Sequence, residues 1–167
     1  MTMHARHLTR LFGTALAACA SGGVLAGNTL TTADALAVVN ASEAAAKQHD
    51  HGKVGSFMSG DCVVSMGAAS GGGAAKQKSG KQYVQDELDA EQHATDHVYQ
   101  SSAPQISLDG GKAIARLRVT ETFTEQGHHV EGVADEVETL ELRDGHVLIT
   151  RIDVTPVSMT IDGTRAL

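Results

Sequence analysis

The sequence contains no tryptophan, and aromatic residues make up only 3% of its 167 residues. Because base- and sugar-binding surfaces rely on stacked aromatic side chains, this scarcity argues against such a surface. Cationic residues are also few: 13 Lys and Arg oppose 20 Asp and Glu, so the net charge is −7, and no cationic cluster occurs. This charge argues against nucleic acid as a partner. No apolar stretch approaches ~20 residues, so we expect one soluble acidic domain without a membrane-spanning helix.

The N-terminus has the pattern of a secretory signal. Arg6 and Arg10 precede the apolar run 11–18, and small residues follow it. Leu16-Ala-Ala-Cys19 resembles the bacterial lipobox, in which the cysteine is lipidated and becomes the new N-terminus. We therefore expect residues 1–18 to be removed and the protein to be exported, either as a membrane-anchored lipoprotein or as a periplasmic or secreted protein. Membrane contact is expected only through the lipid anchor. Cleavage after Ala26 is the alternative.

Only two cysteines occur, and they limit the possible disulfides. If Cys19 is acylated, Cys62 is left without an intramolecular partner. A Cys19–Cys62 disulfide is the alternative. Two valines follow Cys62, so we interpret it as a packed core residue rather than a nucleophile.

The remaining sequence changes from helical to strand-like patterns. After a tether at 19–32, the spacing predicts a helix over 33–49 that presents Leu36, Val39 and Ala44 on one face. The later elements are a helical turn at 54–58, a strand at 62–66, a flexible Gly- and Ala-rich loop at 67–80, a helix at 79–93, and strand-like runs at 97–108, 112–124, 128–143 and 146–157. Residue pairs that favour hairpin turns separate the last runs, such as Asp144-Gly145.

This order predicts an α+β domain. Because the helices precede the main run of strands, we expect three N-terminal helices packed in a strongly curved antiparallel sheet, a cone-shaped α+β barrel. The domain is expected to span residues 33–159, with a C-terminal tail at 160–167.

Two carboxylates fall on otherwise apolar strand faces. Glu121 shares its parity with Leu117, Val119 and Phe123, and Glu138 shares its parity with Leu140. A carboxylate on a core face is costly unless it is paired or hydrogen-bonded. Two interpretations remain open: a bulge or strand end exposes these groups to solvent, or they point into a functional pocket.

Several short motifs together resemble the nuclear transport factor two-like superfamily, including its SnoaL-like proteins. The run 47–64 carries an Asp, spaced apolar residues, an acid and a strand in that family's order, at Asp50, Val54, Phe57, Met58, Asp61 and Val63. Similar matches are the Gly-led helix start at 80–84, the strand and hairpin at 97–113, and the last hairpin at 140–151. The resemblance implies a bent sheet wrapped around helices, with a pocket at one end. It also implies a homodimer formed through the outer face of the sheet.

For each of two known activities of this superfamily, the sequence carries only one of the two catalytic residues. Ketosteroid isomerase-like members place a base after the first strand, where Ser65–Ser70 has no acid, and a second acid near Glu138. In scytalone dehydratase-like members an Asp acts together with a His. In this sequence Lys47 stands at the Asp position, and His97 stands at the His position. Neither activity is therefore transferred.

The sequence leaves two functions open. We favour a module that binds a small apolar or carbonyl-containing molecule or dimerises. The alternative is an isomerase, dehydratase or cyclase that uses His97 and Glu138 as its catalytic acid–base pair, with Glu121 as the alternative to Glu138. The residues expected to contact the ligand are Phe57, Tyr83, Tyr99, Glu121 and Phe123.

Histidines are numerous, but their spacing does not define a metal site. His93 and His97 are four residues apart, and the predicted helix end separates them. Further histidines cluster around Asp50 and at 128–129. We expect no metal and no cofactor.

Overall fold

The computed structural model describes residues 24–25, 29–67 and 74–167. Its helices are α1 (Thr32–Ala46), α2 (His51–Ser56) and α3 (Gly80–Glu91). The strands are β1 (Val24–Leu25), β2 (Met58–Met66), β3 (Lys76–Ser79), β4 (Ala94–Ser101), β5 (Gln105–Asp109), β6 (Lys112–Glu125), β7 (His128–Arg143), β8 (His146–Ile161) and β9 (Thr164–Arg165). None of the helices in this part of the chain has the length and apolar character needed to cross a membrane.

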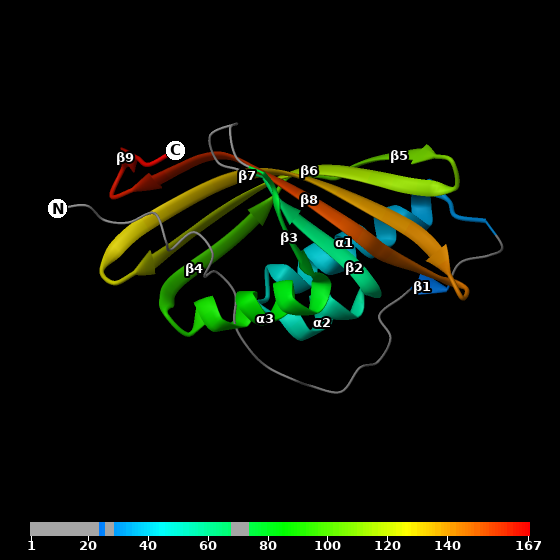
Figure 1. Cartoon of the computed structure of the whole chain (residues 1–167), viewed down its shortest axis with the longest axis horizontal. Coiled ribbons are helices and arrows are strands. Elements are labelled where there is room, and N and C mark those ends of the chain that lie inside the picture. The colour runs from blue at the N-terminus through cyan, green and yellow to red at the C-terminus, as the bar shows by residue number, and fades with distance from the viewer. Residues whose placement is uncertain (1–23, 26–28, 68–73) are drawn as a thin grey trace.

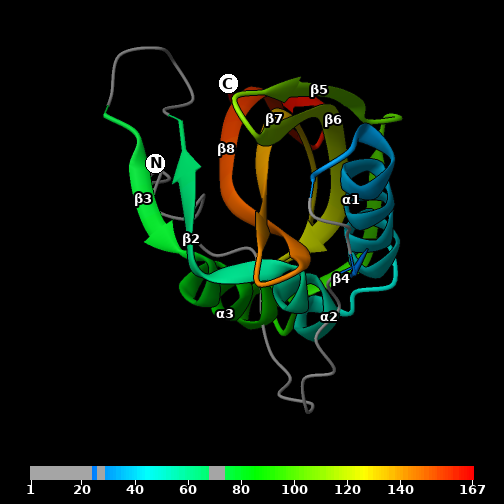
Figure 2. The same cartoon turned by 90° about the vertical axis from the view of Figure 1, so that its right-hand side faces the viewer.

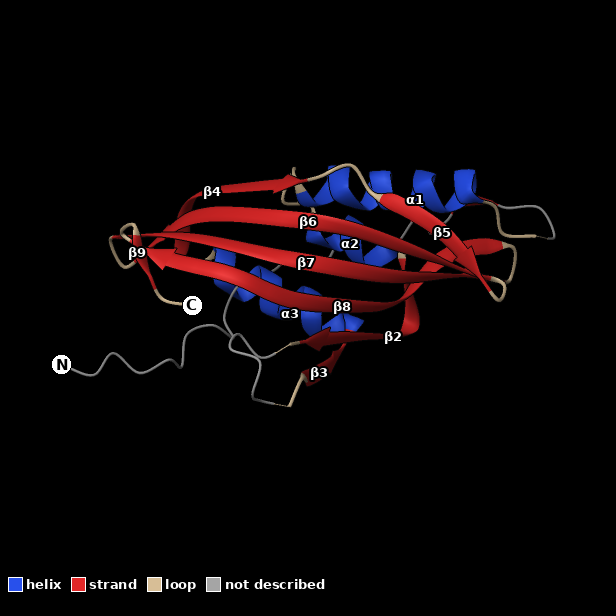
Figure 3. Cartoon of the chain, turned by 90° about the horizontal axis from the view of Figure 1, so that it is seen from above, coloured by secondary structure: helices blue, strands red, loops and turns tan. Residues whose placement is uncertain are grey.

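All strands belong to one strongly curved sheet. Its main order is β3-β2-β8-β7-β6-β4, while β5 pairs with β6, and β1 and β9 pair with β8. The sheet arches over the helices, which lie on its concave side (Figure 1). Figure 2 shows the curvature end on, and Figure 3 shows β6, β7 and β8 running the length of the molecule.

The core fills the space between the helices and the concave sheet face. Its largest fully buried side chains include Val38 and Val39 of α1, Leu140 of β7 and Ile149 of β8. Ala113 and Ala115 of β6 are also fully buried, and their small side chains let α1 approach the sheet closely.

Local sequence signals fix the ends of several elements. Thr31 caps α1 in a capping box with Asp34, and Asp50 accepts a hydrogen bond from the backbone N–H of Lys53 at the start of α2. At the hairpin between β7 and β8, Asp144 and Gly145 adopt φ values of 51° and 78°. Glycine adopts this left-handed conformation without steric cost, and aspartate tolerates it.

The structure confirms the α+β class and the curvature but corrects the predicted sheet. β2 pairs in parallel with β8, so the sheet is mixed rather than antiparallel. The run predicted at 97–108 forms two strands, β4 and β5, because the chain breaks at Ser102-Ala-Pro104. Within the predicted loop 67–80, residues 76–79 form β3 at the edge of the sheet.

One helix face was also predicted wrongly. Leu36 and Ala44 of α1 are exposed, whereas Ala35, Val38 and Ser42 are buried. Strand pairs also lie in segments expected to be tether and tail, because β1 and β9 both pair with β8.

Candidate functional site

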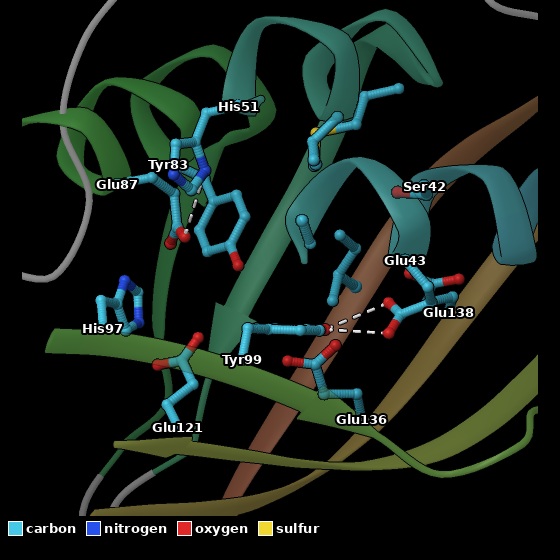
Figure 4. A pocket seen from close by; sticks show the side chains of 14 residues that line it. Ser42, Glu43, His51, Tyr83, Glu87, His97, Tyr99, Glu121, Glu136 and Glu138 are labelled. Atoms are coloured by element: carbon cyan, nitrogen blue, oxygen red, sulfur yellow. Dashed lines mark hydrogen bonds and ion pairs between the residues drawn. The ribbon is translucent and has the colours of Figure 1, made fainter. Parts of the chain in front are cut away.

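A cavity of about 30 Å³ lies between the helices and the concave face of the sheet. This volume holds only water-sized groups. Its ionisable lining residues are Glu43, His51, Tyr83, Glu87, His97, Tyr99, Glu121, Glu136 and Glu138 (Figure 4). Neither Lys nor Arg is among its fourteen lining residues. Five glutamates therefore surround this small space without a cation in the lining.

Strand pairing places three of the glutamates on the concave face. Glu138 lies opposite Ala115 on the neighbouring strand, and Glu136 lies opposite Leu117. Alternation along β6 and β7 points these positions, with Glu121, to the same side as the core. Glu138 is 3% exposed. The interpretation in which a bulge turns Glu121 and Glu138 to solvent is therefore wrong.

The other two glutamates come from helices. Glu43 of α1 follows the buried stripe of Ala35 and Val39 and is 7% exposed. Glu87 of α3 is 4% exposed and lies one turn after Tyr83. Sequence reasoning missed both as site residues, although the spacing of i, i+4 and i+8 from Ala35 already placed Glu43 on the buried face.

Tyr99 divides the cavity into two ends. Its hydroxyl donates to the carboxylate of Glu43, lying 3.1 Å from each oxygen. Figure 4 shows Glu43, Glu138 and Ser42 at one end, and His97 and Glu121 at the other. Since Tyr99 lies opposite Glu121 in the β4–β6 pairing, His97 is a diagonal neighbour of Glu121.

The predicted catalytic pair thus lines one cavity but from opposite ends. His97 is brought there by an irregularity in β4, where the register with β6 shifts between Thr95 and Val98 and Asp96 has a φ of 56°. Such a bulge re-aims the side chain that follows it. Glu121 points toward His97 in Figure 4, whereas Glu138 lies next to Glu43.

Burial shifts the protonation equilibria of these groups. It raises the pKa of Glu138 to about 8, with help from the charge of Glu43. It raises the pKa of Glu121 to about 7, with help from the charges of Glu43 and Glu91. Burial is also the main reason that the pKa values of Glu87 and Glu136 lie well above the usual range and that the pKa of His97 is lowered. The site therefore favours neutral carboxyl groups and a neutral imidazole.

Several buried polar atoms in the cavity have no hydrogen-bond partner among the described residues. They are Glu87 Oε1, Glu138 Oε2 and both ring nitrogens of His97. Buried polar groups are usually satisfied by protein, water or ligand, so these atoms mark where a bound group would be held.

The predicted ligand contacts divide between cavity and core. Tyr83, Tyr99 and Glu121 line the cavity. Phe57 and Phe123 are buried at 2% and 3% exposure but are not part of the lining. Phe123 instead contacts the edge of the His97 ring, with centroids 5.9 Å apart. Cys19 lies outside the described residues.

A second, more open cavity of about 260 Å³, here called the outer cavity, lies between α1 and the connection from β4 to β5. It is formed by α1, Lys47 and the segment 101–104 between β4 and β5. Glu43 lines both cavities, and its carboxylate accepts hydrogen bonds from Tyr99 and Ser101. Glu43 is thus the residue that the two spaces share.

Four residues near the His97 end form a separate cluster. Glu91 Oε1 lies 2.7 Å from His49 Nδ1, 2.7 Å from His51 Nε2 and 3.8 Å from His97 Nδ1. His93 does not join them, because its ring bonds the backbone oxygen of Asp89. His128 pairs with Asp162 at a distant hairpin.

Comparison with known proteins gives similarity in structure only. No family model and no curated protein matches the sequence. An NTF2-like protein from Cytophaga hutchinsonii superimposes with a TM-score of 0.58 at 11% identity, covering 77% of this chain and 100% of that one. A hexachlorocyclohexane dehydrochlorinase from Novosphingobium barchaimii gives 0.59 at 11%, covering 74% and 84%. A putative scytalone dehydratase from Novosphingobium aromaticivorans gives 0.57 at 12%, covering 74% and 82%.

These identities are too low to transfer an activity, because one fold hosts many functions. The structural agreement covers about three quarters of the chain. The chain therefore has the α+β fold of the nuclear transport factor two-like proteins.

Proposed function

We propose that this chain is a small-molecule-binding domain whose cavity receives an uncharged, carbonyl-containing group. The observation that carries this proposal is the lining of five glutamates without Lys or Arg. An anionic group would lose its hydration there and gain no opposite charge, so the site excludes it.

Protonation makes the glutamates suitable partners for a carbonyl. The raised pKa of about 8 leaves the Glu138 carboxyl mostly protonated at neutral pH. A protonated carboxyl group can donate a hydrogen bond, and a carbonyl oxygen accepts one. A purely apolar ligand would leave the orphan oxygens of Glu87 and Glu138 unsatisfied, so the carbonyl class is favoured over the apolar one.

The size of the cavity limits what enters it. A space of about 30 Å³ takes the carbonyl group but not a carbon skeleton. The rest of the ligand would lie in the outer cavity of about 260 Å³, which shares Glu43 with the inner one. Rotation of the Glu43 side chain would join the two spaces.

Three molecules of similar size test the charge preference: cyclohexanone, cyclohexanecarboxylate and cyclohexylammonium. Added separately to the isotope-labelled protein at neutral pH, cyclohexanone should shift backbone NMR signals around the cavity, and the carboxylate should not. Glu138→Ala should weaken the ketone effect, whereas Glu131→Gln, an exposed glutamate on the same strand, should leave it unchanged. Stronger binding of cyclohexylammonium, or equal binding of all three, would overturn the proposal.

A proton-transfer enzyme of the isomerase, dehydratase or cyclase type is the second candidate. It is favoured by the unpartnered nitrogens of His97 and by Glu121, which points toward the ring in Figure 4. For this reaction the carbonyl group would have to lie at the His97 end of the cavity rather than beside Glu43. There a neutral His97 would take a proton from the carbon next to the carbonyl, and a protonated glutamate would hydrogen-bond the oxygen of the resulting enolate. Glu121, rather than the predicted Glu138, would then be the partner nearest to His97.

Deuterium uptake separates this candidate from simple binding. In heavy water, the protein should speed the exchange of the α-protons of cyclohexanone for deuterium. NMR measures this exchange rate. His97→Gln should abolish the acceleration, and His93→Gln, outside the cavity, should keep it. Binding of cyclohexanone without accelerated exchange would support the binding domain and reject the enzyme.

The N-terminal pattern supports a third part of the proposal, export with a lipid anchor at Cys19. Replacing Cys19 with Ala should move the protein from membranes to the soluble fraction in a cell fractionation. Unchanged partitioning would reject lipidation. We also propose a homodimer through the outer sheet face, for which light scattering after gel filtration should give twice the chain mass.

A further inference from the structure

The residues His49, His51, Glu91 and His97 come together at one edge of the cavity from three separate parts of the fold. His49 lies between α1 and α2, His51 begins α2, Glu91 ends α3, and His97 lies in β4. The rings of His49 and His97 are 4.9 Å apart between centroids. One ligand atom from each of His49, Glu91 and His97 lies within 4.8 Å of the other two.

We propose that His49, Glu91 and His97 bind a divalent transition-metal ion of the zinc class. The proposal goes beyond the carbonyl-binding function and replaces our expectation of no metal. Two imidazole nitrogens and one carboxylate oxygen form a ligand set that suits Zn²⁺, whereas Mg²⁺ and Ca²⁺ prefer oxygen ligands throughout.

The spacing of the ligand atoms fits such an ion. A tetrahedral zinc ion holds its ligands at about 2.0–2.1 Å, so the ligand atoms lie roughly 3.3 Å from one another. The distances from Glu91 Oε1 to His49 Nδ1 and His97 Nδ1 are 2.7 and 3.8 Å, on either side of this value. Small side-chain rotations would therefore centre the ion.

His97 supplies an independent reason to expect a ligand here. Its side chain is 11% exposed, and its Nδ1 faces Glu91 Oε1 at 3.8 Å, beyond hydrogen-bond distance. A nearly buried nitrogen without a hydrogen bond costs free energy, and coordination of an ion through Nδ1 would remove that cost.

His51 supports the carboxylate rather than coordinating the ion. Its Nε2 lies 2.7 Å from Glu91 Oε1, and its Nδ1 lies 3.9 Å from Glu87. This contact fixes the orientation of Glu91, as hydrogen-bonded neighbours of metal ligands commonly do. Three protein ligands leave the fourth coordination position for water or a bound molecule, next to the carboxylate cavity that His97 also lines.

The test is a titration of the full chain, freed of metal with a chelator, by Zn²⁺ in competition with a chromophoric chelator. One ion should bind per chain with micromolar or tighter affinity. Co²⁺ in place of Zn²⁺ should give the intense visible absorption of four-coordinate cobalt. His97→Ala should weaken zinc binding by at least about tenfold.

Matched variants keep the test interpretable if His97→Ala fails to fold. His49→Asn removes a partly exposed ligand and, because Asn tolerates the positive φ of 57° found there, should keep the fold and still weaken binding at least about tenfold. His93→Ala and His128→Ala should bind zinc as the wild type does. Absence of stoichiometric binding, unchanged affinity in His49→Asn, or loss in His128→Ala would overturn the metal site.

Cyclohexanone binding measured in the chelator-treated protein reports on the carbonyl-binding function alone. Failure of one proposal is therefore distinguishable from failure of the other.

Discussion

The hydroxyl of Tyr99 lies 3.1 Å from both carboxylate oxygens of Glu43 and thereby links β4 to α1 across the cavity. Tyr99→Phe should remove this link with almost no change in volume. We expect a loss of about 1–2 kcal/mol in the free energy of unfolding, measured with urea, because a buried acceptor loses its donor. The hydrogen bond also lowers the pKa of Glu43, so that pKa should rise further in the variant.

A double-mutant cycle with Glu43→Ala shows whether the loss belongs to this pair. The two substitutions together should cost less than the sum of their separate costs, by about 0.5–1.5 kcal/mol. Strict additivity would mean that the Tyr99 hydroxyl contributes to stability independently of Glu43.

Gly80 permits the close approach of α3 to β2 that positions Glu87 and Glu91. A Cβ atom at Gly80 would lie 3.1 Å from both Cys62 Cβ and Met58 Sδ. We expect Gly80→Ala to destabilise the protein by about 1–3 kcal/mol through overpacking, in spite of the better helix propensity of alanine. Thermal unfolding measures this cost.

Gly60, also close to this contact along the chain, provides the control. A Cβ atom there meets nothing within 4 Å, so Gly60→Ala should leave the melting temperature nearly unchanged. A wild-type melting temperature for Gly80→Ala would show that Met58 and Cys62 yield without cost.

The parts of this fold that sequence predicts well are those fixed by neighbouring residues. Strand β7 spans the predicted range 128–143, because Glu125-Gln-Gly127 and Asp144-Gly145 end the flanking strands with residues that accept positive φ. Parity along β6 and β7 likewise identified Glu121 and Glu138 as carboxylates on an apolar face, and both line the cavity.

The parts that sequence did not give depend on distant contacts. Nothing in Lys76–Ser79 alternates between apolar and polar, because β3 is a polar edge strand that exists only by pairing with β2. The parallel pairing of β2 with β8 joins segments more than eighty residues apart along the sequence. The spacing from Ala35 places Glu43 on the buried face of α1, but only the tertiary fold shows that Tyr99 supplies its partner.

Cys62 is buried, and its thiol pKa is raised to about 11 by burial and by the charges of Glu138 and Asp61. Since the thiolate is the reactive form, we expect Cys62 to resist a thiol reagent such as Ellman's reagent near neutral pH. The experiment uses the Cys19→Ala chain, so that Cys62 is the one cysteine that the reagent can label. Rapid labelling should appear only after urea is added, and rapid labelling of the folded protein would place the thiol at the surface.

The same experiment on the wild-type chain addresses the remaining alternative for its two cysteines. A Cys19–Cys62 disulfide would leave no thiol to label in urea until a reductant is added. Labelling of Cys62 in urea without reductant would exclude the bridge.

The buried glutamates make stability depend on pH in a definite direction. The pKa of Glu138 rises from its ordinary 4.5 to about 8 on folding, and that of Glu121 rises to about 7. Between about pH 4.5 and 8 the folded state holds more protons than the unfolded state, so the free energy of unfolding falls as pH increases. The stabilisation from Glu138 is complete below about pH 4.5 and is lost as pH rises through about 8, at about 1.4 kcal/mol per pH unit for each proton.

Urea unfolding across this range should therefore show decreasing stability, and Glu138→Gln should flatten the decrease because glutamine does not titrate. Glu131→Gln, an exposed position on the same strand, should keep the wild-type slope. The ion-paired surface acids Asp61, Asp135 and Glu141 have lowered pKa values, so their contribution is lost only at pH values below this range. Stability that increases with pH, or an unchanged slope in Glu138→Gln, would mean that the cavity holds Glu138 ionised together with a cation. In that case the cavity would select a positively charged group rather than a carbonyl.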